Sequence, residues 1–457
     1  MDLNSGVILL PTAAVLLIAI ATRSTLPALA GGVLLGHVLL DGPAAVLSLA
    51  ESLTTQLTTS TVAWVVLVCG LLGAITQLLV RAGGTTAFAG LVAARVQTGR
   101  GGLLAAWAAG LMIFLDDYLN VLLIGGGLRP VTDRLRVPRE RLAYVIDATA
   151  APVCLLVPLS TWAIYVAGLL ETSGAAAEGQ GMAAYIGLIP WIFYGWFAIA
   201  IVPLFVCGWI PAWGAMRSAD ARVAAGGNVA PPDSPAEPEA SDGPLTNERL
   251  SDFFLPVAAL VVGTAVSGGD ALRGSIWGLL TVVIQQGIVR RRMSAHALAE
   301  TACRGIGLMV PALATILLAF MLQAINARLG LTEFVIDAAA ARLPGALIPA
   351  VAFAVVSAVT FASGSFWGTY AIALPILVPL SLDAGMDPGL TAAAAISAGG
   401  FGSHACFFGD STVLASQAAG CNNLIHARSQ LPYAILGAGL TIAAYLAAGI
   451  LSAKTLR

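Results

Sequence analysis

Charge is scarce in this chain. Only 10% of its 457 residues are Asp, Glu, Lys or Arg, against roughly 25% in an ordinary soluble domain, and the single lysine is Lys454. A soluble protein of this length needs a polar surface that this composition cannot supply. The formal net charge of −2 excludes the broad basic field that nucleic-acid-binding proteins use. Because 58% of the residues are hydrophobic, the sequence indicates a multi-pass protein whose main partner is the lipid bilayer.

Metal-binding and disulfide patterns are also missing. The six cysteines form no CxxC pair, and most of them lie in apolar runs. They are typical of small buried side chains, not of a zinc site or a disulfide framework. We therefore expect no cofactor, and the only ions to consider are transported ones.

Long apolar runs predict an all-α fold with about ten transmembrane helices, since each crossing needs about 20 apolar residues. The predicted spans are 7–22, 26–40, 60–80, 142–170, 183–210, 253–268, 272–289, 304–325, 390–416 and 431–452. Two further apolar stretches are not counted as spans. Basic loops flank 101–128 on both sides, and 345–381 occupies the corresponding position in the second half. Residues 217–250 are rich in Pro, Ser and acidic residues and predict a flexible cytoplasmic linker.

The arginines predict the orientation. Clusters around Arg95, Arg134 and Arg291 belong in the cytoplasm, while 41–59 and 171–181 lack Lys and Arg and belong outside. Basic loops flank 101–128 on both sides, so this segment is predicted to enter and leave on one side as a re-entrant hairpin. Arg129 with Asp133 and Arg136 with Glu140 are spaced for i,i+4 ion pairs on the cytoplasmic face.

The second half of the chain, 251–457, repeats the order of elements in the first half, 1–216. The hairpin at 345–381 corresponds to 101–128, and 390–416 corresponds to 142–170. Each half has an odd number of crossings, so the second half enters from the opposite side. An inverted repeat with paired hairpins and broken helices is typical of secondary transporters.

Acidic residues deep in apolar segments are the strongest functional signal. Asp116 and Asp117 lie at the predicted turn of the first hairpin, with Asn120 nearby. A charged side chain at the middle of a bilayer costs about 2.5–3.5 kcal/mol on insertion scales, so it is kept only where a cation, a proton or water compensates it. The alternative is a position near the surface, where the two acids cap a helix.

Two predicted helix breaks carry further polar groups. Asp147 and Thr149 precede Pro152, which removes a backbone donor and breaks the helix. The corresponding break is expected at the glycine-rich segment 397–404. His404 at its end could carry a proton or be a packing residue. Asp147 could instead pair with the nearby arginines.

Hydroxyl groups cluster at symmetric positions. Ser160 lies in the first broken helix, and the second hairpin carries several near its turn. Asp410 could bind an ion or cap a helix, and two hydroxyls follow it directly. The candidate hydroxyl ligands are Thr149, Ser160, Ser363, Ser365, Thr369, Ser411 and Thr412.

These motifs resemble a known family. The DDY at 116–118, RP-x-TD at 129–133, ID-x-TAAP at 146–152 and P-x-S-x-W at 158–162 occur in the order found in the NhaC-type sodium/proton antiporters of the ion transporter superfamily. The segments 362–376 and 402–434 together resemble the second signature of that family. The resemblance implies an ion-coupled exchanger of the inner membrane, with homodimers and a transport domain that moves against a scaffold.

The resemblance also implies a site. The matching positions are Asp116, Asp117, Asn120, Asp147, Thr149, Ser160, Gly364, Trp367, Thr369, His404, Asp410 and Thr412. Asp116, Asp117 and Asp410 are the candidates for sodium. Members of the family commonly have an acid at the position of Ser403 and a serine or threonine at that of Phe366. These departures leave open an organic solute in place of sodium.

Three functions therefore remain as hypotheses. The leading one is Na⁺/H⁺ antiport, and the second is H⁺- or Na⁺-coupled exchange of a small organic solute. A remote third is an intramembrane protease, because Ser363 with His404 is similar to a serine–histidine dyad and Gly409-Asp410 to an aspartyl-protease motif. Neither protease motif is complete, so we expect a transporter and not an enzyme.

Overall fold

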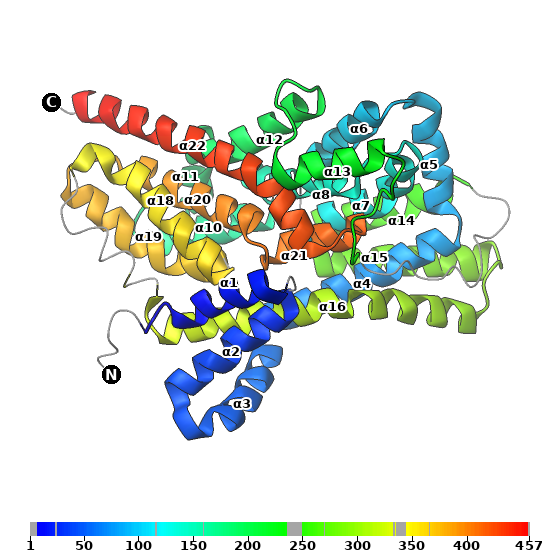
Figure 1. Ribbon diagram of the computed structural model, residues 1–457, viewed down its shortest axis with the longest axis horizontal. Helices are drawn as coiled ribbons and strands as arrows, with labels where there is room; N and C mark the ends of the chain where they lie inside the picture. Colours follow the sequence, from blue (N-terminus) through cyan, green and yellow to red (C-terminus); the bar gives the residue numbers. More distant parts are fainter. Residues whose placement is uncertain are drawn as a thin grey trace.

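The computed structural model describes residues 7–22, 25–114, 117–158, 160–234, 249–268, 270–331, 334, 344–364 and 366–455. Within these ranges every regular element is a helix, which confirms the all-α prediction (Figure 1).

The helices divide between the two halves of the chain. The first half comprises α1 (Leu10–Thr22), α2 (Thr25–Asp41), α3 (Ala45–Thr58), α4 (Ser60–Arg81), α5 (Gly84–Arg95), α6 (Gly99–Met112), α7 (Asp117–Arg134), α8 (Arg139–Ala148), α9 (Ala151–Cys154), α10 (Thr161–Thr172), α11 (Gly181–Leu188), α12 (Phe193–Val206) and α13 (Gly214–Ala224). The second comprises α14 (Ser251–Val266), α15 (Ala271–Val283), α16 (Ala295–Arg328), α18 (Ile348–Ser363), α19 (Phe366–Asp383), α20 (Pro388–Ala405), α21 (Asp410–Ala419) and α22 (Asn423–Thr455).

Several helices have the length and composition of membrane spans. Five stretches qualify, namely Leu26–Thr58, Val62–Arg81, Ala271–Val289, Gly345–Ala362 and Asn423–Ser452. Two bent helix pairs, with bends of 48° and 42°, raise the number to seven if each pair is one span. The chain is thus a multi-pass membrane protein, while the larger number of spans predicted from the sequence stays a prediction.

Some helices begin earlier than their apolar runs. The last helix begins at Asn423 and not at 431, because Asn422 Oδ1 accepts a hydrogen bond from Ile425 N at 3.1 Å and caps it. Likewise, Ser294 caps α16 well before the predicted start at 304. Polar caps of this kind extend a helix beyond its apolar segment. The segment 41–59, predicted as an outside loop, contains α3.

Two helical hairpins occupy the predicted positions. Helices α6 and α7 form the first, and α18 and α19 form the second. Gly364 ends α18 with φ +73, and a Cβ there would lie 2.4 Å from a ring carbon of Phe408. The turn therefore needs glycine both for its backbone and for the close ring. Because Gly345–Ala362 is long enough to cross a membrane, the re-entrant depth of this hairpin remains a prediction.

The first broken helix has the predicted form, and the second breaks elsewhere. Helix α8 ends at Ala148, and α9 begins at Ala151 beside Pro152. Helix α20, however, continues through the glycines at 399, 400 and 402 and ends at Ala405, so the break lies at 406–409. A Cβ at those glycines would lie 2.2 Å from Tyr370, 2.4 Å from Leu155 and 2.3 Å from Thr360. The glycines therefore allow close packing and do not break the helix.

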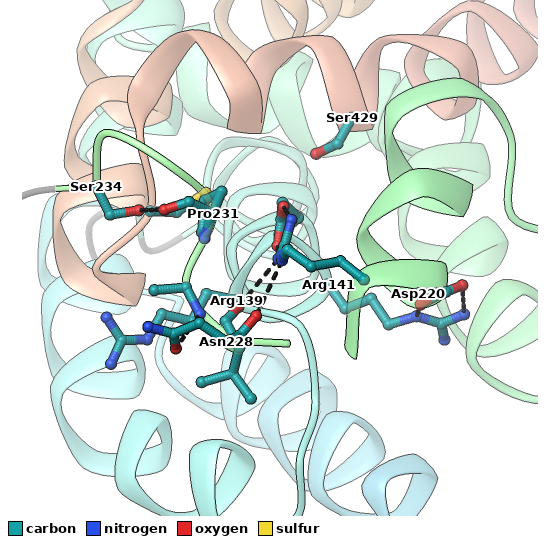
Figure 2. A network of polar contacts seen from close by, with 12 residues as sticks. Arg139, Arg141, Asp220, Asn228, Pro231, Ser234 and Ser429 are labelled. Atoms are coloured by element: carbon teal, nitrogen blue, oxygen red, sulfur yellow. Dashed lines mark hydrogen bonds and ion pairs between the residues drawn. The ribbon is translucent and has the colours of Figure 1, made fainter. Parts of the chain in front are cut away.

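Part of the predicted linker is ordered. Helix α13 spans 214–224, and Arg141 on α8 makes a bidentate ion pair with Asp220 on α13 at 2.6 and 2.7 Å (Figure 2). Arg222 on α13 binds both oxygens of buried Glu140 at 2.8 Å. These pairs hold residues 217–224 against α8, so that part of the flexible-linker prediction is wrong. Residues 235–248 lie outside the described residues.

The two predicted i,i+4 ion pairs had different outcomes. Arg129 lies 3.8 Å from Asp133 within α7, as expected. The second prediction is wrong, since Glu140 pairs with Arg222 and Arg136 donates to Gly227 O at 2.7 Å. The helix ends at Arg134 and Arg136 has φ +55, so the i,i+4 spacing no longer holds there.

The two halves interlock in a regular pattern. Helices α4 and α16 pack along each other, while α2 contacts α16 as α15 contacts α4. In the same way, α12 and α22 pack together, while α12 contacts α20 as α22 contacts α8. One apolar core joins the first hairpin to α21, and a second joins the second hairpin to α9 and α10. Figure 1 shows α1, α2 and α16 along one side of the molecule.

One close backbone contact between the halves involves two glycines. A Cβ on Gly305 in α16 would lie 2.3 Å from Gly73 O in α4, and one on Gly73 would lie 2.6 Å from Gly305 O. We predict that Gly305→Ala lowers the free energy of unfolding by about 1–3 kcal/mol, the usual cost of overpacking. Thermal unfolding of the purified protein in detergent measures this.

The matched control is Gly307→Ala, on the same helix, where a Cβ meets nothing within 4 Å. This change should leave the protein as stable as before or stabilise it by about 0.5–1 kcal/mol, because alanine favours helix. Equal melting temperatures for the two variants would contradict the proposed role of the α4–α16 contact.

Candidate functional site

A tyrosine and an aspartate join the two halves near the second break. Tyr118, in the first turn of α7, donates a hydrogen bond from its hydroxyl to Asp410 Oδ2 at the start of α21. The other carboxylate oxygen of Asp410 accepts a hydrogen bond from Ser411 N at 2.8 Å. Both side chains are buried. Asp410 is therefore a buried acid in the first turn of α21, and its side-chain partner Tyr118 comes from the other half of the chain.

Asp117 lies beside this pair. It is the first residue of α7, directly before Tyr118, and is only 2% exposed. Asp117 is therefore enclosed by protein, and its depth in the membrane stays a prediction. Asp116 lies outside the described residues.

Asn120 ties the first hairpin to the first break. Its Nδ2 lies 2.7 Å from Gly110 O, 2.6 Å from Ile113 O and 3.0 Å from Thr149 O. The side chain is fully buried, and its Oδ1 has no hydrogen-bond partner in the described structure. The amide thus fixes the end of α6 and the end of α8 together, and it leaves one oxygen for a further donor or a cation.

The hydroxyls at the first break bond to backbone carbonyls. Thr149 Oγ1 donates to Val145 O, one turn back in α8, at 2.9 Å. Ser160 Oγ donates to Cys154 O at 2.6 Å and accepts from Ala163 N at 3.0 Å, so it caps α10. Both hydroxyls stabilise the interrupted helix, and a transported ion would have to share them.

The second break is held by a similar set of bonds. Ser403 and Ser411 have their hydroxyl oxygens 3.0 Å apart, and Thr412 Oγ1 donates to Ser403 O at 3.0 Å. All three residues are buried. Ser403 thus ties the end of α20 to the start of α21.

Asp147, in the last turn of α8, has partners on the last helix of the chain. Its Oδ2 accepts hydrogen bonds from Gln430 Nε2 at 2.7 Å and from His426 Nε2 at 3.1 Å. Gln430 Nε2 also lies 2.6 Å from His404 O. All of these residues are buried. The alternative that Asp147 pairs with the arginines is not what the structure shows, because Arg139 binds Asp133 and Arg141 binds Asp220.

His404 completes this buried polar region. Its Nδ1 lies 2.8 Å from the Tyr194 hydroxyl on α12, and its ring stacks against Tyr144 at a centroid distance of 6.2 Å. Its Nε2 has no hydrogen-bond partner in the described residues. His404 is therefore anchored through Nδ1, and its Nε2 can form a further hydrogen bond or bind a proton.

An aromatic pair lies at the second hairpin. Phe366, the first residue of α19, stacks on Trp162 of α10 with ring centroids 3.5 Å apart. Thr369, one turn further along α19, is buried. Ser365 and the side chains of Ser363 and Trp367 lie outside the described residues. Within the described part of the chain, no group of three or more His, Cys, Asp or Glu side chains is arranged to hold a metal ion.

Three polar residues at this site escaped prediction from the sequence: Tyr118, His426 and Gln430. His426 is a second buried histidine among the polar groups, 3.1 Å from Asp147. The sequence does contain a signal for His426 and Gln430. Together with Asn422 they recur every fourth residue and so share one face of a helix, although the predicted spans 390–416 and 431–452 leave this segment between two helices.

Comparison with known proteins covers most of the chain. The profile of a family described as the Na⁺/H⁺ antiporter family matches residues 153–450. An uncharacterized protein of Haemophilus influenzae is 29% identical to the chain, over 98% of this chain and 92% of that protein. The profile match begins inside α9, so Asp147, Asn120 and the first hairpin precede it.

Asn120 offers a test of the first break. Asn120→Ala removes the donor that joins α6, α7 and α8 and leaves buried carbonyl oxygens unsatisfied, so we predict a loss of about 1–3 kcal/mol in the free energy of unfolding. Thermal unfolding in detergent, followed by the loss of the monodisperse size-exclusion peak, measures it. The control is Asn228→Ala at an exposed position, which should change stability by less than about 0.5 kcal/mol. Similar losses for both would contradict the bridging role.

Proposed function

Because the chain belongs to the Na⁺/H⁺ antiporter family, we propose that it is a secondary active transporter that exchanges sodium for protons by alternating access. Membership of this family points to a transporter and not to an enzyme. The remote protease hypothesis needs His404 bonded to a serine hydroxyl. In the structure the His404 Nδ1 is hydrogen-bonded instead to the Tyr194 hydroxyl, at 2.8 Å. The finer features, namely the NhaC type, the inner membrane and a homodimer with an elevator-like motion, are parts of the proposal.

One observation carries the proposal. Asp410 and Asp117 are both buried where the first hairpin meets the second broken helix, with Asp410 bonded to the Tyr118 hydroxyl and Asp117 directly before Tyr118 in α7. Two carboxylates in one apolar region repel each other when both are ionised and uncompensated. A bound sodium ion removes that repulsion, and its positive charge disfavours a proton on the buried acids around it. Sodium and protons therefore oppose each other's binding, and opposition of this kind at a site open to one side at a time is the basis of antiport.

The packing supports an inverted repeat. The contact of α2 with α16 has its counterpart in that of α15 with α4, and the contact of α12 with α20 has its counterpart in that of α22 with α8. This is the pattern expected when equivalent helices are related by a two-fold axis. A broken helix in each half beside a helical hairpin agrees with the arrangement that secondary transporters use near the midplane.

A second candidate function is exchange of a small organic solute. The observation that favours it is the aromatic pair of Trp162 and Phe366, together with Phe407 and Phe408 at the second break. Aromatic rings attract organic cations through their faces. On this hypothesis the rings, and not the carboxylates alone, select the substrate.

A proteoliposome assay separates the two candidates. With a pH gradient imposed and a pH-sensitive dye inside the vesicles, added Na⁺ or Li⁺ should move protons and change the dye signal in the wild type. Asp117→Asn and Asp410→Asn should abolish the response, since each removes a negative charge on which sodium binding depends.

The control is Asp383→Asn, an exposed aspartate at the end of α19, which should transport like the wild type. A wild type that is silent with Na⁺, Li⁺ and K⁺ but responds to an organic cation would favour the second candidate. Full activity in Asp410→Asn would overturn the assignment of the site.

A further inference from the structure

Asp147 and His426 form a second acid site that the sodium proposal does not use. The two side chains are fully buried and lie in contact, with Asp147 Oδ2 3.1 Å from His426 Nε2. They come from α8 and α22, helices of opposite halves. Tyr118 and Asp410 likewise join opposite halves, but they belong to α7 and α21. The two acid sites therefore involve different helices.

Several atoms of this cluster are buried without a hydrogen-bond partner in the described structure. They are Asp147 Oδ1, His426 Nδ1 and Gln430 Oε1. Buried polar atoms are normally satisfied, and an exception calls for an explanation such as a missing water or ion. Here a carboxylate oxygen and an imidazole nitrogen are both available, and a proton can bind to either.

The chemistry of the pair suits a proton better than sodium. Sodium is a hard cation that prefers several oxygen ligands, as other hard cations do. An imidazole nitrogen offers it little, and Gln430 turns its nitrogen towards Asp147. With one shared proton the pair carries either no charge as a neutral acid and neutral imidazole, or balanced charges as carboxylate and imidazolium. Loss of that proton leaves one buried negative charge.

The surroundings of the pair contain other titratable and charged groups. Tyr144 lies on α8 itself, Tyr194 on α12, Asp117 and Tyr118 on α7, His404 on α20, Asp410 on α21, and Arg428 and Tyr433 on α22. Arg428 is exposed. Helix α8, which carries Asp147, packs against α21, which carries Asp410. The two acid sites are therefore neighbours, and a charge at one acts on the other through an interior that screens it little, although they share no ligand.

We propose that Asp147 and His426 together hold the proton that is exchanged, while sodium binds at Asp117 and Asp410. This inference rests on the proposed function and divides its two ions between two neighbouring sites. When sodium arrives beside Asp410, its positive charge favours release of the proton from the Asp147–His426 pair. When the proton returns, it disfavours sodium. Gln430 is a positioning residue, because it binds both Asp147 and the backbone of His404.

Two transport measurements on the full-length protein in liposomes test the division. The first is ²²Na⁺ exchange against Na⁺ at equal pH on both sides, which needs no net proton movement. The second is Na⁺-driven proton movement, followed with an internal pH dye. We expect His426→Gln to lose the second and to keep the first, and its sodium exchange to lose the pH dependence of the wild type. Asp410→Asn should lose both.

The matched control is His37→Gln. His37 is also a buried histidine whose ring lies 3.2 Å from a carboxylate, that of Asp41, but it belongs to α2. It should keep both activities. Asp147→Asn, which conserves the shape of the side chain, should behave like His426→Gln and serves if the histidine variant does not fold.

Each result decides the inference. Retained proton movement in both His426→Gln and Asp147→Asn would overturn it. Loss of both activities in these variants would also overturn the inference, because the pair would then belong to the sodium site or support the structure alone. Loss of proton movement in His37→Gln would overturn it as well. A wild type without either activity would be a failure of the proposed function itself, and the inference would fall with it.

Discussion

Uncompensated negative charge in an apolar interior is the constraint on which the rest of this structure depends. Asp147 and Asp410 lie among buried side chains, and neither is bonded to an arginine. Each is held by neutral or titratable donors, namely a tyrosine, a glutamine and a histidine. Arginine would neutralise such an acid permanently. Donors without a fixed charge leave the acid able to accept a cation or a proton, and a transporter needs that freedom.

The arginines are used at the other end of α8. Arg139, Arg141 and Arg222 bind Asp133, Asp220 and Glu140, largely in bidentate geometry. The same helix thus begins in a network of fixed ion pairs and ends in an acid with exchangeable partners. Strong pairs at one end hold the helix in place, so the position of Asp147 at the other end is fixed by ion pairs in which it takes no part.

Much of this architecture follows from the sequence, and the misses have physical causes. The helical hairpins and the break at Pro152 could be predicted because apolar length and proline act locally. The second break could not, since Gly399, Gly400 and Gly402 look like helix breakers until the side chains of Tyr370, Leu155 and Thr360 are placed against them. His426 was missed because its helix begins with a polar turn. The partner of an acid depends on which helices meet, and that information is distributed over the whole chain.

The pairing of acids with the opposite half also bears on how the protein is made. Asp147 is synthesised early, but His426 and Gln430 belong to α22, and His426 follows Asp147 by 279 residues. Throughout synthesis of the intervening chain, the membrane must therefore accommodate α8 without these partners of its acid. Until α22 inserts, that carboxyl group can only be protonated or solvated by water, so its final surroundings form late in the synthesis of the protein.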